Sequence, residues 1–232
     1  MATAVLTRES VEAYAAALAP LDVVAMPVTR SAPPPDPDAI ARALARPYAA
    51  IVVASARAAE AVKHAPGEIW AVGPATRRVL AHAIHPDGVR DAAGLARALV
   101  AARSLAGARV IVPRAEDGRT EAIEILRAAG AEVDDVIAYR TVAVGAGDPA
   151  VAAGRELLAS HAAAACCVFA PSQVAALLAI VGPLAGIPTA FCAIGETTAA
   201  ALRAAGIARP IVAATPTPEG LARAIALHSR PA

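Results

Sequence analysis

The sequence predicts an α/β protein with two doubly wound parallel-sheet domains, one inserted into the other and joined to it by a two-stranded β-ladder hinge. Three observations support this fold class. Short apolar runs alternate with helical segments along the chain. Several segments recur in the same order in the two halves of the chain, which indicates two copies of one unit. One further segment recurs out of order, which indicates that one copy is split by the other.

The apolar runs are predicted strands because each has about four to eight apolar residues and is followed by a helical segment. Runs of this kind are typical of parallel strands buried on both faces beneath helices. In chain order they read AVLT, YAAIVVAS, IWAVG, ARVIVPR, AACCVFAPS, AFCAIG and PIVAATPTP. The helices predicted to follow them are Glu9–Leu18, Ala56–His64, Ala75–Ala83, Thr120–Gly130, Gln173–Val181, Thr197–Ala205 and Glu219–His228.

Three repeated segments support the duplication. GLARA occurs at Gly94 and again at Gly220, 126 residues later. AVGPATRRVL is matched by AIGETTAAAL at a shift of 122 residues. VVASARAAEAV is matched by VFAPSQVAALL, which aligns Ser55 with Ser172 at a shift of 117 residues. The similar shifts and the common order predict two related domains.

The segment that recurs out of order predicts the domain boundaries. ARVIVPRAEDGRTEAIEILRAAGAEVDDVIAYR ends the first copy, but its counterpart, TAVLTRESVEAYAAALAPLDVVAMPVTR, lies near the amino terminus. We therefore expect residues 1–27 and 146–232 to form a discontinuous α/β domain around an inserted α/β domain, residues 34–135. Residues 28–33 and 136–145 are predicted linker strands that pair as a hinge, with a cleft between the two lobes.

Composition and charge argue against several classes of protein. The chain is 57% hydrophobic, but its longest stretch without a charged residue, 162–195, is interrupted by Pro and Gly, so we expect no membrane span. The net charge is only +1, without the basic cluster of a nucleic-acid-binding surface. The amino end lacks a signal-peptide pattern, and we expect a cytoplasmic protein.

Neither metal-binding nor nucleotide-binding motifs are found. Cys166, Cys167 and Cys192 lie in apolar runs without a C-x-x-C spacing, and we expect them in the core. G-x-G-x-x-G and G-x-x-x-x-G-K-[ST] are both absent, as is a Ser-His-Asp signature. We therefore expect no cofactor and no metal.

Two Gly-x-x-Thr motifs are candidate anion sites. In AIGETTAAAL, Gly195 is expected to turn the chain from strand to helix, while Thr197 or Thr198 caps the helix or bonds a ligand. Gly73 and Thr76 repeat this arrangement in AVGPAT. Both turns follow strands, at the sheet edge where ligands of doubly wound folds bind, and helix N-termini favour phosphate or carboxylate. A plain helix cap is the structural alternative for each motif.

With these motifs assembled, the chain resembles the uroporphyrinogen-III synthase family over essentially its whole length. The resemblance is carried by VLTR, VVASARAAEAV, AVGPAT, GRTEAIEILRAAGAEVDDVIAYRT, APSQVAAL, AIGETTAAAL and TPTPEGLARAI, in this order. It implies two α/β domains, a two-stranded β-ladder between them and an active site in the cleft. It also implies a cofactor-independent enzyme.

The reaction implied by the resemblance is a cyclising hydro-lyase step in tetrapyrrole biosynthesis, which leads to haem, sirohaem, cobalamin and chlorophyll. Hydroxymethylbilane, a linear tetrapyrrole with eight carboxylates, loses water and closes with inversion of its last pyrrole ring. The product is uroporphyrinogen III, whereas spontaneous closure gives the uninverted isomer I. The expected partners are this substrate and, transiently, hydroxymethylbilane synthase. We expect a monomer that binds neither nucleic acid nor membranes.

The resemblance also implies site residues. Tyr139 matches the functionally important tyrosine of the family, and its phenol can donate a proton to the departing hydroxyl; packing between lobes is the structural alternative. Arginines that follow strands can form paired hydrogen bonds with carboxylates, and Arg57 and Arg114 are the preferred candidates. The expected substrate-binding residues are Arg8, Ser55, Arg57, Gly73, Thr76, Arg114, Ser172, Gly195, Thr197 and Thr198.

Two other functions remain open from the sequence alone. A two-lobed binding or sensing protein would close on an anionic small molecule without changing it. A degenerate copy of the synthase would have a regulatory role. Product analysis with hydroxymethylbilane distinguishes both from an active enzyme.

Overall fold

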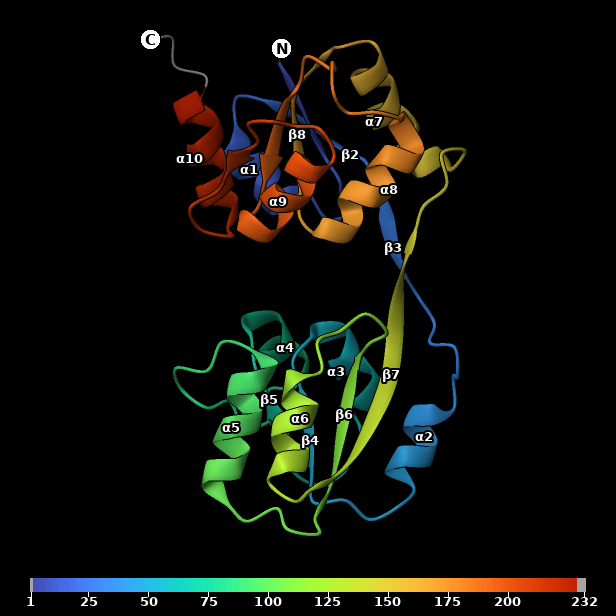
Figure 1. Cartoon of the computed structure of the whole chain (residues 1–232), viewed down its shortest axis with the longest axis vertical. Coiled ribbons are helices and arrows are strands. Elements are labelled where there is room, and N and C mark those ends of the chain that lie inside the picture. Colours follow the sequence, from blue (N-terminus) through green and yellow to red (C-terminus); the bar gives the residue numbers. More distant parts are fainter. Residues whose placement is uncertain (1, 229–232) are drawn as a thin grey trace. The chain divides into compact units, whose positions relative to one another are not determined.

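In the computed structural model, which describes residues 2–228, the chain forms two compact units. Unit 1 consists of Met1–Arg30 and Val142–Ala232, and unit 2 consists of Ser31–Thr141. Each unit contains one five-stranded sheet with helices packed against it (Figure 1). The predicted α/β fold class, with two mostly parallel sheets, is therefore confirmed.

The sheet of unit 1 has the strand order β10-β9-β8-β1-β2, and its neighbouring strands pair in parallel. Its strands are β1 (Thr3–Leu6), β2 (Asp22–Ala25), β8 (Ala163–Val168), β9 (Ala190–Ala193) and β10 (Ile211–Val212). Its helices are α1 (Glu12–Leu18), α7 (Pro149–Ala159), α8 (Pro171–Val181), α9 (Glu196–Ala204) and α10 (Pro218–His228).

The sheet that lies mainly in unit 2 has the strand order β5-β4-β6-β7-β3, and β4 to β7 pair in parallel. Its strands are β3 (Thr29–Ala32), β4 (Ala50–Val53), β5 (Ile69–Ala71), β6 (Arg109–Ala115) and β7 (Glu132–Ala143). Its helices are α2 (Ala39–Leu44), α3 (Ala56–Val62), α4 (Pro74–Val79), α5 (Ala92–Ala102) and α6 (Glu121–Ala128). The chain passes from one unit to the other along β3 and again along β7.

The two sheets have the same order of equivalent strands. In unit 1 the chain runs outward from β8 to β9 and β10 on one side, and from β1 to β2 on the other. In unit 2 it runs from β4 to β5 on one side, where a parallel bridge joins Trp70 to Ile84, and from β6 to β7 on the other. The direction in which successive strands are added to the sheet therefore reverses between β8 and β1, and between β4 and β6, although these strands are parallel. These are the two topological switch points.

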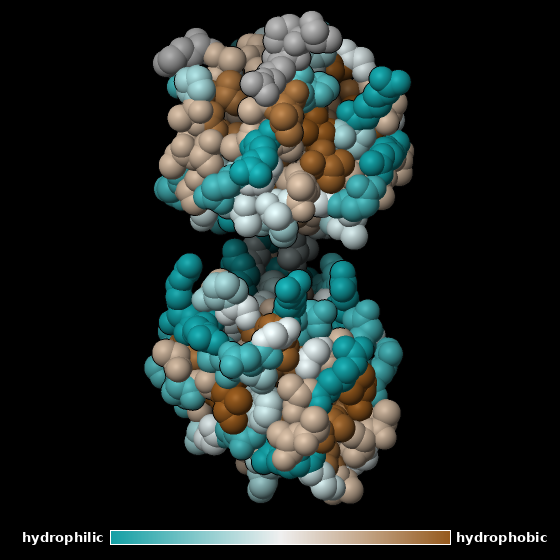
Figure 2. Space-filling model, turned by 90° about the vertical axis from the view of Figure 1, so that its left-hand side faces the viewer, coloured by the Kyte–Doolittle hydropathy of each residue, from teal (hydrophilic) through white to brown (hydrophobic). Residues whose placement is uncertain are grey.

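Both sheets are buried on both faces: successive strand residues point to opposite sides, and in each unit they belong to two separate hydrophobic cores. In unit 1, Cys166 packs into the core on one face of the sheet, while Cys167 and Cys192 pack on the other. All three are free thiols in the core, and burial raises the pKa of Cys166 well above the usual value, while hydrogen bonding with Cys192 together with burial raises that of Cys167. On the side shown in Figure 2, hydrophilic residues are spread over both units and hydrophobic residues form small groups.

The repeated GLARA segments occupy equivalent places at two helix starts. Asp91 caps α5 by accepting the backbone N–H of Gly94, and Thr217 caps α10 by accepting that of Gly220. A side chain at Gly220 would clash with Thr215, so this helix start requires glycine. No helix within residues 2–228 combines the length and apolar character needed to cross a membrane.

Candidate functional site

In doubly wound sheets, ligands bind outside the carboxyl ends of the strands, at the switch point where the strand order reverses. In unit 1 this point lies where β1 and β8 end, next to Arg8 and Phe169. In unit 2 it lies where β4 and β6 end, next to Ser55 and Glu116. Most of the predicted site residues lie in the loops and helix starts that follow these strands and their neighbours.

Tyr139 and Ser55 are brought together in unit 2. Tyr139 lies on β7 opposite Ala115, the last residue of β6, and its half-buried ring packs against the core. Its hydroxyl donates to Ser55 Oγ over 3.4 Å. Ser55 is the N-cap of α3, and its Oγ also accepts the backbone N–H of Ala58 at 3.1 Å. A phenol and a serine hydroxyl therefore share one position at the carboxyl edge of the sheet.

Gly73 and Thr76 form the second hydroxyl-bearing turn of unit 2. Gly73 precedes α4 with a φ of 97°, a conformation that favours glycine. Thr76 is only 2% exposed, and its hydroxyl has no hydrogen-bond partner within residues 2–228. A cavity of about 380 Å³ borders this turn. It is lined by Ala71, Val72, Gly73, Pro74, Arg77, His85, Pro86, Asp87, Gly88 and Val89. Another cavity, of about 390 Å³, lies in unit 1 and is lined mostly by apolar residues.

The equivalent turn of unit 1 corrects two expectations. Gly195 is itself the N-cap of α9, so neither Thr197 nor Thr198 caps the helix. Its φ of −179° is extended backbone that any residue adopts, so the turn does not require glycine. Thr197 is exposed, whereas Thr198 is 1% exposed. Like Thr76, Thr198 has no hydrogen-bond partner for its hydroxyl in the part of the chain that the structure describes.

Ser172 is not the structural equivalent of Ser55, contrary to the repeat alignment. The N-cap of α8 is Ala170, which has no side-chain oxygen, and Ser172 is the second residue of the helix. In the structure the residue equivalent to Ser55 is Ala170, since each is the N-cap of its helix. The repeat alignment is therefore shifted by two residues at this helix start. Ser172 is exposed and lies at the carboxyl edge of unit 1, beside Gln173.

Arg8 lies at the switch point of unit 1, next to two aromatic rings that also contact each other. Its guanidinium carbon is 4.8 Å from the centre of the Tyr14 ring and 5.0 Å from that of Phe169. The Nε atom is buried without a hydrogen-bond partner. Within residues 2–228 no carboxylate pairs with this arginine, so it is held by cation–π contacts alone.

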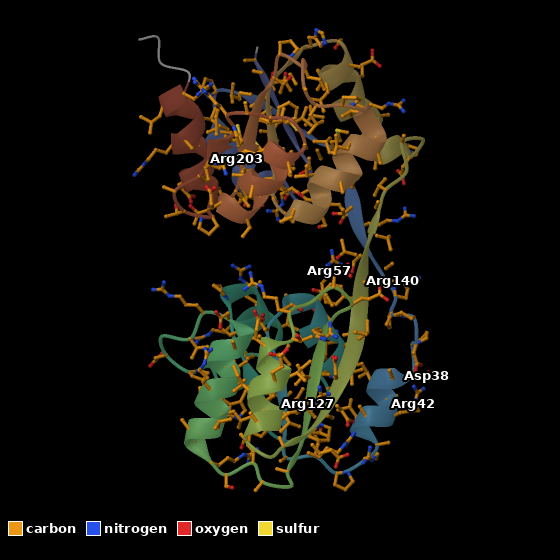
Figure 3. All side chains as sticks on the ribbon, viewed as in Figure 1. Asp38, Arg42, Arg57, Arg127, Arg140 and Arg203 are labelled. Carbon is orange, nitrogen blue, oxygen red and sulfur yellow. The ribbon has the colours of Figure 1, made fainter. Side chains whose placement is uncertain are left out.

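The two preferred arginines behave differently. Arg57 is exposed at the N-terminal end of α3, without an ion-pair partner among the described residues (Figure 3). Arg114 pairs with Asp135 through Nε–Oδ1 at 2.6 Å and Nη2–Oδ2 at 2.8 Å. Its Nη1 donates to three backbone carbonyl oxygens. Asp135 raises the pKa of Arg114, and all the nitrogens of this guanidinium are engaged within unit 2, whereas those of Arg57 are not.

The sequence analysis missed the residues that surround Arg8. Gln173 Oε1 accepts the hydroxyl of Thr7 at 2.7 Å and the backbone N–H of Phe169 at 2.9 Å, which links the ends of β1 and β8. Tyr14 and Phe169 contact each other edge to face, with ring centres 4.9 Å apart. Aromatic residues make up 3% of the chain, so Phe169 near the end of the predicted strand AACCVFAPS was a signal that could have been used.

The chemistry available at these edges is mainly hydrogen-bond donation and positive charge. No group of three or more His, Cys, Asp or Glu side chains is placed to hold a metal within residues 2–228. Hydroxyls without partners and guanidiniums without acids are suited to carboxylates. The phenol of Tyr139 adds a proton donor.

Comparisons with known proteins agree with this description. A family model, HEM4, described as "Uroporphyrinogen-III synthase HemD", matches residues 12–223. A uroporphyrinogen-III synthetase structure from Helicobacter pylori has a TM-score of 0.67 at 18% identity, covering 99% of this chain and 100% of that one. A mutant uroporphyrinogen III synthase from the extremely thermophilic bacterium Thermus thermophilus has a TM-score of 0.58 at 21% identity, covering 99% and 98%. No curated protein matches the sequence.

The structures show a shared fold, and the family model spans most of the chain. The chain therefore belongs to the uroporphyrinogen-III synthase family, whose members are enzymes of tetrapyrrole biosynthesis.

Proposed function

We propose that the chain acts as a hydro-lyase that cyclises hydroxymethylbilane to uroporphyrinogen III, with Tyr139 as its proton donor. The observation that carries this assignment is the pair formed by Tyr139 and Ser55. It holds an O–H donor at the carboxyl edge of a doubly wound sheet, where ligands of this fold class bind. The 3.4 Å bond is long, so a substrate hydroxyl can replace Ser55 as the acceptor.

The reaction begins with cleavage of the C–O bond at the terminal hydroxymethyl carbon. Tyr139 donates its proton to the leaving hydroxyl, which departs as water and leaves an electrophilic azafulvene. The substituted carbon of the last pyrrole ring attacks this centre and forms a spiro intermediate. Fragmentation and reclosure invert that ring, and the proton released when the pyrrole regains aromaticity balances the one taken from Tyr139.

Substrate carboxylates are proposed to bind the donors at the carboxyl edges of both sheets. Thr76 and Thr198 are buried residues that form no side-chain hydrogen bond within residues 2–228, and neither hydroxyl oxygen is among the fully buried atoms without a partner, so a ligand can reach both. Arg57 contributes charge. The remaining proposed contacts are Arg8, Ser55, Gly73, Ser172, Gly195 and Thr197, whereas Arg114 is assigned to holding the loop after β6.

The family match favours this enzyme over the two-lobed binding protein. The two functions differ in their products, because a binding protein leaves hydroxymethylbilane to close spontaneously. We therefore propose that the purified chain be supplied with freshly generated hydroxymethylbilane, and that the oxidised products be separated by chromatography. Predominant isomer III supports the synthase. Isomer I alone, from folded protein, would contradict it.

The role of Tyr139 is tested with Tyr139→Phe, which keeps the ring and removes the donor. Removing a general acid lowers kcat by about a hundredfold or more. Tyr48→Phe is a matched control, because Tyr48 lies in the same unit and its hydroxyl donates to the carbonyl of Pro66. We expect the control to keep isomer III formation. Near-normal kcat in the Tyr139 variant would show that its phenol only packs in the sheet.

Three further properties are proposed on the same basis: a monomer, a cytoplasmic location and a transient contact with hydroxymethylbilane synthase. Sedimentation of the purified chain, alone and with that synthase, tests the first and the third. Cell fractionation tests the second.

A further inference from the structure

The two units carry equivalent arginines at the ends of equivalent strands. Arg8 follows β1 in unit 1, and Arg114 lies near the end of β6 in unit 2. Each strand borders the switch point of its sheet, since β1 pairs with β8 and β6 pairs with β4. Arg8 is two residues after Leu6, which pairs with β2, and Arg114 is two residues after Val112, which pairs with β7.

Strand register explains why only one of these arginines has an acidic partner. Val112 pairs with Asp135 on β7, and Arg114, two residues further along β6, reaches this carboxylate diagonally. In unit 1, Leu6 pairs with Ala25 on β2. Ala25 therefore occupies the place that Asp135 has in unit 2. The acidic partner is missing from unit 1 because of one residue.

Aromatic rings replace that carboxylate as the support of Arg8. Tyr14 on α1 is 8% exposed, and Phe169 follows β8. The two rings contact the guanidinium carbon at 4.8 and 5.0 Å. Only Nε is among the buried nitrogens without a partner, so the two terminal nitrogens reach solvent with their donors unused in the part of the chain that the structure describes.

We infer that Arg8 is a dedicated carboxylate receptor of unit 1, positioned by Tyr14 and Phe169 and available because Ala25 stands where unit 2 has Asp135. The inference rests on the proposed function for the identity of the ligand, a side-chain carboxylate of the linear tetrapyrrole. Tyr14 and Phe169 are positioning residues, because they act by fixing the plane of the guanidinium. Arg8 contacts the carboxylate through its terminal nitrogens.

The decisive variant is Ala25→Asp, which supplies the missing acid without touching Arg8. An aspartate at this place pairs with Arg8 as Asp135 pairs with Arg114, and it then competes with the ligand. We expect KM for hydroxymethylbilane to rise about tenfold or more, with kcat changed far less. Arg8→Met, which keeps a flexible apolar stem beside the rings and removes the guanidinium, is expected to have the same effect.

A positioning role for Phe169 is tested by its own pair of variants. Phe169→Leu removes one ring and is expected to raise KM, whereas Phe169→Tyr keeps the ring and restores the normal value. A merely structural role would lower stability without this split between KM and kcat. Arg203→Gln is the matched control for Arg8→Met. Arg203 is an arginine of the same unit that lies in the last turn of α9 and pairs with Glu196 over 2.5 Å.

Binding without turnover separates this inference from the proposed function. The probe is uroporphyrin I, an octacarboxylate that the enzyme does not convert, titrated calorimetrically into wild type, Ala25→Asp, Arg8→Met and Arg203→Gln. If Ala25→Asp and Arg8→Met bind the probe more weakly than wild type and Arg203→Gln does not, the result supports the carboxylate receptor, even if wild type forms only isomer I. Unchanged binding and KM in Arg8→Met would overturn it, even if wild type forms isomer III. Arg8→Met also decides the matter if Ala25→Asp does not fold.

Discussion

The turns that precede α4 and α9 share the Gly-x-x-Thr motif but differ in what they require of the glycine. Gly73 has a φ of 97°, which a side chain rarely tolerates, whereas Gly195 is extended at −179°. A Cβ at Gly195 would meet nothing within 4 Å. Thr76 and Thr198, by contrast, are buried alike. Gly73 is therefore required by the backbone conformation of its turn, whereas Gly195 is not required by its backbone and leaves open space at the start of α9.

The largest expected effect is on stability, in Gly73→Ala. A side chain forced into this glycine conformation lowers the free energy of unfolding by about 1–3 kcal/mol. Trp70, the single tryptophan of the chain, lies on β5 just before the turn and reports on unit 2. Urea unfolding followed by its fluorescence measures the loss. Gly147→Ala, in unit 1, where an added Cβ meets nothing within 4 Å, is the control, and its unfolding is followed by circular dichroism, which reports on the helices of both units; equal stability of both variants would refute the assignment.

A smaller effect separates the threonines of the two turns from a structural threonine. Thr189 is buried and its hydroxyl donates to the carbonyl of Ala163 at 2.9 Å, so Thr189→Val is expected to lose about 1 kcal/mol of stability. Thr76→Val and Thr198→Val remove hydroxyls without a partner within residues 2–228, and we expect stability within about 0.5 kcal/mol of wild type. KM should instead rise several-fold in both. Unchanged KM would mean that these hydroxyls do not contact substrate.

Gly195→Ala is expected to change stability far less than Gly73→Ala. Alanine fits extended backbone and restricts the unfolded chain, but it is a poorer N-cap than glycine, so the two effects offset each other and we expect stability within about 0.5 kcal/mol of wild type. The new methyl group occupies the open space, and we expect KM to increase. A variant with normal KM would show that ligand does not approach this turn. Calorimetric melting and steady-state kinetics measure the two quantities.

The smallest expected effect concerns the buried thiols, which report on unit 1. The thiolate is the reactive form. Burial raises the pKa of Cys166, and hydrogen bonding with Cys192 together with burial raises that of Cys167, so both stay protonated and protected near pH 8. We expect a disulfide reagent to label them only as fast as unit 1 unfolds, at the same rate in Gly195→Ala and wild type. Fast labelling of the native protein would contradict the buried core.

Local patterns in the sequence predicted much of the fold. Apolar runs located seven strands, and the 122-residue repeat placed Thr76 and Thr198 at equivalent positions. β2 (Asp22–Ala25) and α7 (Pro149–Ala159) were not among the predicted strand–helix pairs, because four residues and an Ala-rich stretch give a weak periodicity. The pairing of Arg114 with Asp135 depends on the register between β6 and β7. This register joins residues more than twenty positions apart and is set by tertiary structure.

The split of unit 1 has a consequence for biosynthesis. β1 is made first, but its neighbour β8 is not complete until Val168 has been added. Unit 2 needs only the residues up to Thr141. On the ribosome, the inserted unit can therefore finish folding before β8, the strand that pairs with β1, has been made. Until then β1, α1 and β2 lack the rest of their sheet. Chaperone binding to nascent chains would be concentrated on that waiting segment.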